Sequence, residues 1–339
     1  MDDVSKLADL IKGSRKILIT SHISPDPDSI CSVLLLGSTL KLNYPDKEVT
    51  VNLEEKSDEL DFLSDYKNII FHPIQGSIES FQPDVLIMLD SNNYDRCSRR
   101  DGDKIRTYIN QTQIKTVIID HHEPTNKDVS DIYINLGNIA VVQDAYEICF
   151  ETLKLNKPKD HAYLTMLGLY SDSGGFTYTN KNHRKTFKIV SDLIDQGVSL
   201  EEIKNKLNSH NEDHMKVIGE LASNVSHEKD YSYSFVNDSF VRIWQDQNKS
   251  MDSFGSACKF FIDQYIRNIE DRRWGFIVYR DLLAGEAVYG VSLRSIGAKP
   301  DVSIIAARLR GGGHKAAAGA KFQAQNVEEA IKKVQQTIS

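Results

Sequence analysis

The feature that most constrains the fold is a series of short apolar runs, separated by helical patterns, in the first half of the chain. The runs occupy residues 16–20, 49–53, 68–72, 84–90 and 115–120. Strands that are apolar on both faces belong to a parallel sheet covered by helices on each side. Residues 29–43 and 103–111 have the periodicity expected of such helices. The pattern predicts an α/β domain with a mostly parallel sheet.

The pattern becomes mainly helical from about residue 140, and strand-like runs return after residue 226. With 339 residues, the chain is long enough for two domains with separate cores. We expect an α/β domain at residues 1–190, a helical linker at 191–225 and a smaller α+β domain at 226–339.

Composition excludes several classes of protein. The chain is 40% hydrophobic and 26% charged, and no stretch approaches the ~18 apolar residues of a membrane helix. Its four cysteines are far apart and form no CxxC pair, which favours a reduced compartment and a cytoplasmic location. The formal charge of −7 argues against a stable complex with long nucleic acid.

Carboxylates and histidines follow the predicted strands. They come after the run at 16–20, at the end of the run at 84–90, and at and just after the end of the run at 115–120. A further aspartate ends the helical pattern at 160–172. Ligands of a parallel sheet bind beyond the carboxyl ends of its strands, so these groups should converge. The residues are His22, Asp26, Asp28, Asp90, Asp120, His121, His122 and Asp172.

Mixed carboxylate and imidazole ligands suit divalent ions such as Mn²⁺. Four aspartates, at 26, 28, 90 and 172, would balance two such ions, and two ions ~3.5–4 Å apart share a carboxylate. Without metal, carboxylates that close would repel each other. Pro25 and Pro27 are expected to keep helix out of the turn and to stiffen it. Asp120 is expected to orient an imidazole from behind.

The motifs "SHISPDPDS", "LDSNNYDR", "IDHH" and "GLYSDSGGF" resemble the four motifs of the DHH phosphoesterase superfamily. "GGGHKAAAG", preceded by "VSLRS", resembles the DHH-associated C-terminal domain of that superfamily. Together they cover nearly the whole chain in the expected order. The size resembles that of the short members, the oligoribonucleases and 3'-phosphoadenosine 5'-phosphate phosphatases of the nano-RNase group.

The resemblance implies roles for individual residues. His22, Asp26 and Asp90 would hold one manganese ion, and Asp28, Asp90, His121 and Asp172 the other, with Asp90 bridging. His122 would lie beside the scissile phosphate as a catalytic residue, with Asp120 behind the histidines. The substrate contacts would come from Arg96, Arg294, Gly312, Gly313 and His314.

The sequence departs from the family pattern at four positions. Ser24 and Pro27 stand where family members usually have Asn and Gly, and Ser173 stands where Thr is frequent. Asp144 lies at the start of a helix that usually begins with small, hydroxyl-bearing residues, and the sequence offers no account of it. These departures affect the loop geometry and leave the implied metal ligands intact.

The glycine-rich stretch before His314 is expected to be a turn that presents backbone amides to an anion. Between residues 287 and 325 there are six basic residues and a single acid, Asp301, in a chain that is acidic overall. Such a local reversal of charge suits a phosphorylated ligand.

The expected function is manganese-dependent hydrolysis of short oligonucleotides, pApA-like dinucleotides or 3'-phosphoadenosine 5'-phosphate, by water activated between two metal ions in the inter-domain cleft. The alternatives are a RecJ-like single-strand exonuclease, a non-catalytic nucleotide-binding regulator and a pyrophosphatase of the same superfamily. The substrate among these, the polarity of attack and a homodimeric state are left open.

Overall fold

The computed structural model describes residues 3–57, 60–122, 130–178, 182–207, 209–282 and 287–338. The chain divides into two compact units, residues 1–208 and 209–339, and each is described by itself. The division point falls within the range expected to be a linker, after helix α9 (Leu200–Leu207) and before helix α10 (Glu212–Ser223).

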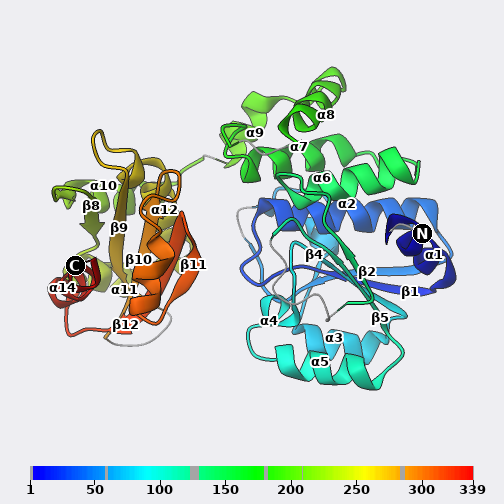
Figure 1. Cartoon of the computed structure of the whole chain (residues 1–339), viewed down its shortest axis with the longest axis horizontal. Helices are drawn as coiled ribbons and strands as arrows, with labels where there is room; N and C mark the ends of the chain where they lie inside the picture. Colours follow the sequence, from blue (N-terminus) through cyan, green and yellow to red (C-terminus); the bar gives the residue numbers. More distant parts are fainter. Residues whose placement is uncertain are drawn as a thin grey trace. The chain divides into compact units, whose positions relative to one another are not determined.

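The first unit is built on a six-stranded sheet in the order β3-β2-β1-β4-β5-β6, and every neighbouring pair is parallel. This confirms the predicted parallel α/β domain. Figure 1 labels β1, β2, β4 and β5 of this sheet. The strands are β1 (Lys16–Thr20), β2 (Glu48–Leu53), β3 (Ile70–Phe71), β4 (Val85–Leu89), β5 (Lys115–Ile119) and β6 (Ile132–Ile134).

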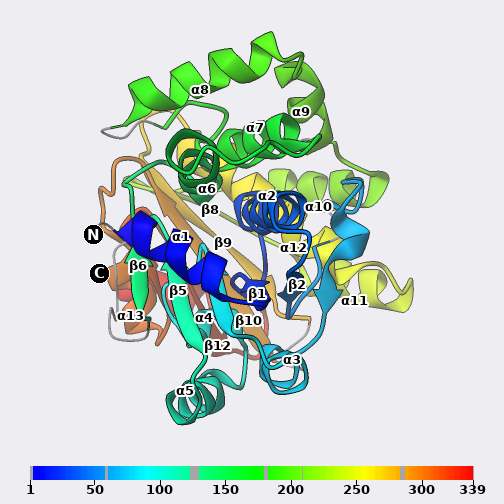
Figure 2. The same cartoon turned by 90° about the vertical axis from the view of Figure 1, so that its right-hand side faces the viewer.

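Helices cover both faces of this sheet, as Figure 2 shows. One face packs against α1 (Asp3–Gly13), α2 (Pro27–Asn43), α6 (Val141–Tyr146) and α7 (His161–Asp172). The other packs against α3 (Ile74–Phe81), α4 (Tyr94–Cys97) and α5 (Gly102–Gln111). A π-helical turn, η4 (Glu147–Thr152), extends α6, and α8 (His183–Asp195) follows α7.

Alternate residues of the central strands enter different cores. In β1, Ile17 and Ile19 belong to the core on the α2 side, whereas Leu18 belongs to the core on the α5 side. All three are fully buried. Because both faces of each central strand are buried, apolar and polar residues do not alternate along these strands.

The expectation that proline excludes helix from the turn after β1 is wrong for Pro27. Helix α2 begins at Pro27, with Asp26 as the N-cap whose Oδ1 accepts a hydrogen bond from the backbone N–H of Ser29 at 3.0 Å. Proline fits this position because the first helical N–H has no intrahelical acceptor and the ring fixes a helical φ. Asp28 therefore lies in the first turn of a helix.

The second unit is an α+β domain with a six-stranded sheet in the order β11-β12-β10-β9-β8-β7. Among the described strands of this sheet, only β8 and β9 pair in parallel. One face packs against α13 and α14, and the other against α10 and α12. Its elements are β7 (Ser226–His227), β8 (Ser232–Phe235), α11 (Asp238–Asp246), α12 (Met251–Gln264), η5 (Ile266–Asn268), β9 (Trp274–Arg280), β10 (Val288–Ser295), α13 (Val302–Arg308), β11 (Gly312–His314), β12 (Ala317–Gln323) and α14 (Val327–Ile338).

The glycine-rich stretch is not simply a turn, because Gly312–His314 form strand β11 at the edge of this sheet. A Cβ on Gly311 would lie 2.1 Å from the carbonyl oxygen of Gly319, and one on Gly313 would lie 2.6 Å from that of Ala317. These two glycines are therefore required by close approach to β12. Gly312 is exposed and has open space beside it.

Among the described residues, no helix has both the length and the apolar character needed to span a membrane.

Candidate functional site

The sequence-predicted carboxylates and histidines of the first unit do converge. They lie at the carboxyl ends of β1, β4 and β5, the N-terminus of α2 and the C-terminus of α7. From β1 the chain continues to β2 and β3 on one side of β1, and then returns to β4 on its other side. The carboxyl ends of β1 and β4 therefore form the topological switch point of the sheet. Open α/β sheets bind their ligands at that point.

One cluster joins His22, Asp26 and Asp90. Nε2 of His22 lies 3.2 Å from Oδ2 of Asp90 and 3.8 Å from Oδ2 of Asp26. Nδ1 of His22 lies 2.7 Å from the carbonyl oxygen of Ile23, which can only accept, so Nδ1 carries the proton. In the neutral ring, the lone pair of Nε2 therefore faces the two carboxylates.

A second cluster joins Asp28, His121 and Asp172. Asp28 is fully buried, and its carboxylate accepts hydrogen bonds from the backbone N–H groups of Val141 at 2.6 Å and Val142 at 2.9 Å. Burial raises the pKa of Asp28 to about 7, with a further rise from the charge of Asp26 and opposition from these two hydrogen bonds. The N-terminus of α6 thus holds a carboxylate that solvent does not reach.

His121 connects this second cluster to Asp90. Its Nε2 lies 3.5 Å from Oδ2 of Asp172 and 3.6 Å from Oδ1 of Asp90. The backbone of Ile139 also lies beside the ring. Burial, together with the charge of His122, lowers the pKa of His121 to about 4, so the ring is neutral at neutral pH and able to ligate a metal.

Asp90 occupies the centre of both arrangements. It follows β4 with φ at +53°, a conformation that costs free energy for a residue other than glycine. Its backbone N–H still donates to the carbonyl of Ile119 at 3.0 Å. Burial, followed by the charges of Asp26 and Asp28, raises the pKa of Asp90 well above its usual range.

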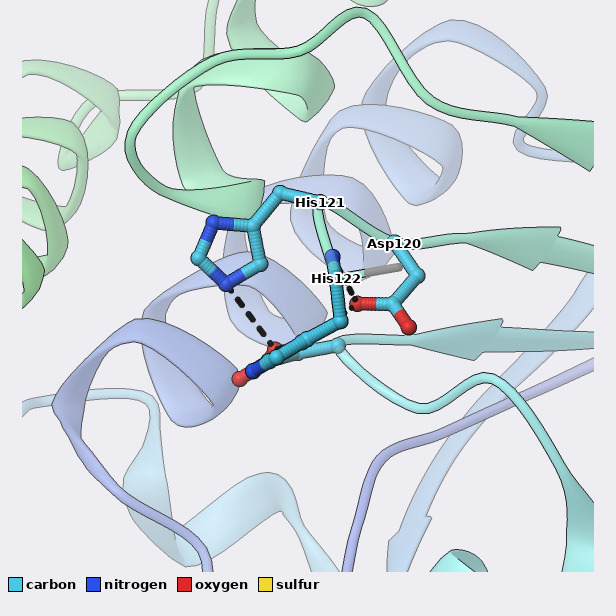
Figure 3. Close-up of side chains that lie close together, drawn as sticks. Asp120, His121 and His122 are labelled. Carbon is cyan, nitrogen blue, oxygen red and sulfur yellow. Dashed lines mark hydrogen bonds and ion pairs between the residues drawn. The ribbon is translucent and has the colours of Figure 1, made fainter. Parts of the chain in front are cut away.

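His122 and Asp120 form a pair beside these clusters (Figure 3). Nδ1 of His122 lies 2.8 Å from Oδ1 of Asp120, which also accepts from the backbone N–H of His122 at 3.2 Å. Burial lowers the pKa of His122, but the bond to Asp120 and the charge of Asp90 raise it overall. Conversely, burial raises the pKa of Asp120, but the hydrogen bond and charge of His122 lower it overall. The pair therefore favours a protonated His122 beside an ionised Asp120.

The donors of this site fit divalent cations. Oδ1 of Asp90 is buried, and no described residue gives it a hydrogen bond. The nitrogens of His121 and His122 lie 3.6 and 3.4 Å away, too far for a good hydrogen bond. A buried carboxylate oxygen that accepts no hydrogen bond is costly unless a cation occupies the site. The surrounding oxygen and imidazole nitrogen donors match the preference of Mn²⁺ and similar ions. The arrangement supports a divalent metal site with Asp90 at its centre.

The turn that carries His22 and Asp26 is held by contacts that sequence reasoning missed. Ser24 has φ at +54°, and its backbone N–H donates to Oε2 of Glu55 at 2.8 Å. Oε1 of Glu55 accepts from Nε of Arg99 at 2.6 Å. Arg96 lies nearby: its carbonyl accepts from the N–H of Ile23 at 2.7 Å, and its charge acts on His122. No local sequence signal identifies Glu55.

The four predicted substrate residues of the second unit lie on its sheet. Arg294 of β10 and His314 of β11 are both paired with Ala317 of β12, so their side chains project from the same face. Two strand spacings, about 10 Å, separate their backbones. Nε of Arg294 donates to Oδ1 of Asp263 at 2.7 Å. Gly312 and Gly313 are exposed beside His314.

Comparison with known protein families identifies two domains in the chain. Residues 16–169 match the DHH family N-terminal domain, and residues 252–339 match the DHHA1 domain. The first match contains every clustered residue except Asp172, and the second contains all four substrate residues predicted in the second unit.

Individual proteins resemble the chain over most of its length. The bifunctional oligoribonuclease and PAP phosphatase NrnA of Bacillus subtilis is 27% identical over 90% of this chain and 89% of its own. A probable manganese-dependent inorganic pyrophosphatase of Streptococcus equi subsp. zooepidemicus is 24% identical over 55% of this chain and 58% of its own. The solved structure of an exopolyphosphatase-related protein from Bacteroides fragilis aligns with a TM-score of 0.83 and 25% identity, covering 99% of this chain and 95% of its own.

Proposed function

Because the chain belongs to the DHH superfamily and is a hydrolase of phosphoester bonds, we propose that it hydrolyses short oligoribonucleotides and 3'-phosphoadenosine 5'-phosphate with two divalent ions, preferably Mn²⁺. The convergence of the two acidic clusters on Asp90 carries the proposal. The likeness to the oligoribonuclease and PAP phosphatase supports this choice of substrates, because it extends over both domains.

Two groups of residues would hold the ions. One group is His22, Asp26 and Asp90, and the other is Asp28, Asp90, His121 and Asp172, with Asp90 shared. Divalent ions at such a site lower the pKa of coordinated water and neutralise charge on phosphoryl oxygens. Calcium should serve poorly, since it prefers more numerous, all-oxygen ligands.

His122 would act on the scissile phosphate as a hydrogen-bond donor. Because Nδ1 of His122 faces Asp120, Nε2 is the ring nitrogen proposed to face the substrate. The raised pKa of His122 favours a proton on Nε2. Asp120 would hold the ring in place and stabilise its positive charge while a phosphoryl oxygen accepts the hydrogen bond.

The second unit would bind the substrate away from the metal ions. Arg294, His314 and the backbone of Gly312 and Gly313 are proposed contacts, with Arg96 contributing from the first unit. A small set of contacts on an acidic chain suits a small anionic substrate better than an extended strand. We therefore expect the preferred substrates to contain about two to five nucleotides.

The test is a side-by-side assay of the purified protein with Mn²⁺ at physiological salt. The substrates are a ribonucleotide dimer, pentamer and 24-mer of one sequence type, 3'-phosphoadenosine 5'-phosphate and inorganic pyrophosphate. We expect kcat/KM to be highest for the dimer, pentamer and bisphosphate nucleotide, and to fall for the 24-mer. Equal cleavage of the dimer and the 24-mer would favour a RecJ-like exonuclease, and a preference for pyrophosphate would favour a pyrophosphatase.

A further inference from the structure

Asp144 has no place in the proposed chemistry, yet it is fully buried in the first turn of α6. Its Oδ1 accepts a hydrogen bond from Nδ2 of Asn138 at 2.7 Å. Its Oδ2 lies 3.5 Å from the backbone N–H of Leu136. Both contacts go to the stretch between β6 and α6, residues 135–140, which contains neither helix nor strand. This stretch is called the 135–140 segment below.

The 135–140 segment lies against His121 and His122. Nδ2 of Asn135 donates to the carbonyl of His122 at 3.1 Å. The backbone of Ile139 lies beside the ring of His121. Directly after the segment, the N–H groups of Val141 and Val142 hold the carboxylate of Asp28. One irregular stretch of chain therefore reaches three groups of the site.

Side chains supply the support that regular structure would otherwise provide. Asp144 holds the segment from the helix that follows it, through Asn138 and Leu136. Asn182, just before α8, holds it from another direction. Its Nδ2 lies 3.0 Å from the carbonyl of Leu136, 3.1 Å from that of Gly137 and 3.0 Å from Oδ1 of Asn138.

From these contacts we infer that Asp144 is a positioning residue for the metal site, acting through Asn138 and the 135–140 segment on His121 and Asp28. The inference rests on the proposed function, because it concerns the same metal site. Hydrogen-bond partners behind metal ligands typically change metal affinity by about 10–100-fold when they are removed. Since Asp144 acts one step further back, we expect the lower end of that range.

The test uses the full chain without metal and measures Mn²⁺ affinity by isothermal titration calorimetry, with Tm recorded for each variant. Asp144→Asn keeps the shape of the side chain but replaces one carboxylate oxygen by an NH₂ group, which cannot accept a hydrogen bond. One of the two donors that now contact Asp144 would lose its acceptor, so Mn²⁺ affinity should fall about tenfold. Exchanging the two residues, in Asn138→Asp/Asp144→Asn, reverses donor and acceptor in the bond between the two side chains. The amide oxygen at position 144 can still accept from the N–H of Leu136, and a carboxylate oxygen at position 138 can still accept from Nδ2 of Asn182. This double variant should bind Mn²⁺ with near-native affinity, a rescue that a general loss of packing would not produce.

Glu147→Gln is the matched control. Glu147 is also buried and lies one turn further along, but it contacts Nε2 of Gln143 at 2.9 Å and Nζ of Lys185 at 2.6 Å. Its replacement should lower Tm while Mn²⁺ affinity stays native. If Asp144→Asn does not fold, Asn182→Ala loosens the same segment from its other side and should lower the affinity instead.

The outcomes separate this inference from the proposed function. If the native protein binds Mn²⁺ no better than Asp90→Asn, the metal site itself is wrong, and the role of Asp144 falls with it. If the native protein binds Mn²⁺ and Asp90→Asn does not, while Asp144→Asn or its substitute Asn182→Ala binds as tightly as native, only the inference about Asp144 is overturned.

Discussion

At the scale of single residues, Asp90 combines three properties that a structural aspartate would rarely share. It is 2% exposed, its φ is +53° and no described residue donates a hydrogen bond to its buried Oδ1. Each property costs stability. Together they leave the carboxylate facing three histidines, His22, His121 and His122. The raised pKa of Asp90 has the same origin, since burial and neighbouring aspartates disfavour its ionised form.

Replacing Asp90 by asparagine tests this interpretation without disturbing the backbone, since asparagine tolerates positive φ. Asp90→Asn should lower Mn²⁺-dependent turnover by more than about 100-fold, because a ligand is lost as well as its orientation. The metal-free variant should melt no lower than the native protein, since a buried repulsive charge is removed. Turnover assays and thermal melts in EDTA give the two measurements.

Asp84→Asn is the control for that variant, because Asp84 lies just before the same strand, at its opposite end. Its Oδ2 accepts from the N–H groups of Arg15 and Lys16 at 2.7 and 2.8 Å. An asparagine oxygen can accept these bonds, so turnover should stay native. A variant at Asp90 that is as active as the one at Asp84 would remove Asp90 from the site.

The metal-free protein should become more stable as the pH falls from 8 to 6.5. Asp28 and Asp144 have pKa values raised from 3.8 to about 7, so in this range the folded state binds protons that the unfolded state does not. The expected gain is about 1 kcal/mol per group. Below pH 6.5 the lowered pKa of His121, about 4, opposes the gain, because its unfolded form takes up a proton that the folded form resists.

Saturating Mn²⁺ should reverse this dependence, since protons compete with metal for the same ligands. Melting curves at pH 8, 7.2 and 6.5, recorded in EDTA and in excess Mn²⁺, test both signs. A metal-free Tm that falls between pH 8 and 6.5 would contradict the assignment of raised pKa values to these aspartates.

At the scale of elements, the site depends on how closely α2, α6 and α7 approach each other. Gly168 in α7 allows this approach: a Cβ there would lie 2.8 Å from Cγ1 of Val142 and 3.1 Å from Oδ1 of Asp28. An added methyl group would displace Val142 and the carboxylate of Asp28, which accepts a hydrogen bond from the N–H of Val142. The packing of three helices and the position of Asp28 are therefore linked.

Gly168→Ala should lower stability by about 1–3 kcal/mol and weaken Mn²⁺ binding, because β-branched Val142 cannot easily move aside. Gly219→Ala is the matched control within another helix, α10, where no atom lies within 4 Å of the added methyl. That change should raise stability by up to about 1 kcal/mol through helix propensity. Equal effects of the two substitutions on Tm would exclude a packing role for Gly168.

At the scale of the whole molecule, the two units have separate hydrophobic cores and different chemistry. The clustered acids and histidines belong to the first unit, whereas the predicted substrate residues Arg294 and His314 belong to the second. Among the described residues, the proposed metal ligands thus all belong to the first unit. Binding of metal and binding of the distal part of the substrate should be separable properties.

Hydrogen exchange with and without Mn²⁺ tests this separation on the full chain. A ligand stabilises the structure to which it binds, so Mn²⁺ should slow exchange mainly between residues 16 and 172. Arg294→Ala should leave that protection unchanged and should raise KM for a dinucleotide. Equal Mn²⁺ protection in both units, or native KM in Arg294→Ala, would contradict this division of roles.

The sequence by itself determined the features that follow from local patterns. The apolar runs predicted the central strands of a parallel sheet, because strands buried on both faces cannot alternate with polar residues. The carboxyl-end rule then placed His22, Asp90, His121 and Asp172 together, and the structure has them in contact. The short strand β6 and the helices α3 and α4 were not predicted, because their patterns are too short to be distinctive.

Only the tertiary structure decided how the site is supported. Asp144 contacts Asn138, in a segment that the sequence pattern predicts as loop. Glu55 hydrogen-bonds to Ser24, which lies 31 positions earlier in the sequence. The close approach of β12 requires glycine at position 313. Pro27 starts a helix because Asp26 caps it and Asp28 is held by α6, 113 residues away. Hydrogen bonds between residues so far apart leave no periodic pattern in the sequence. They form only when the helices and the sheet have packed together.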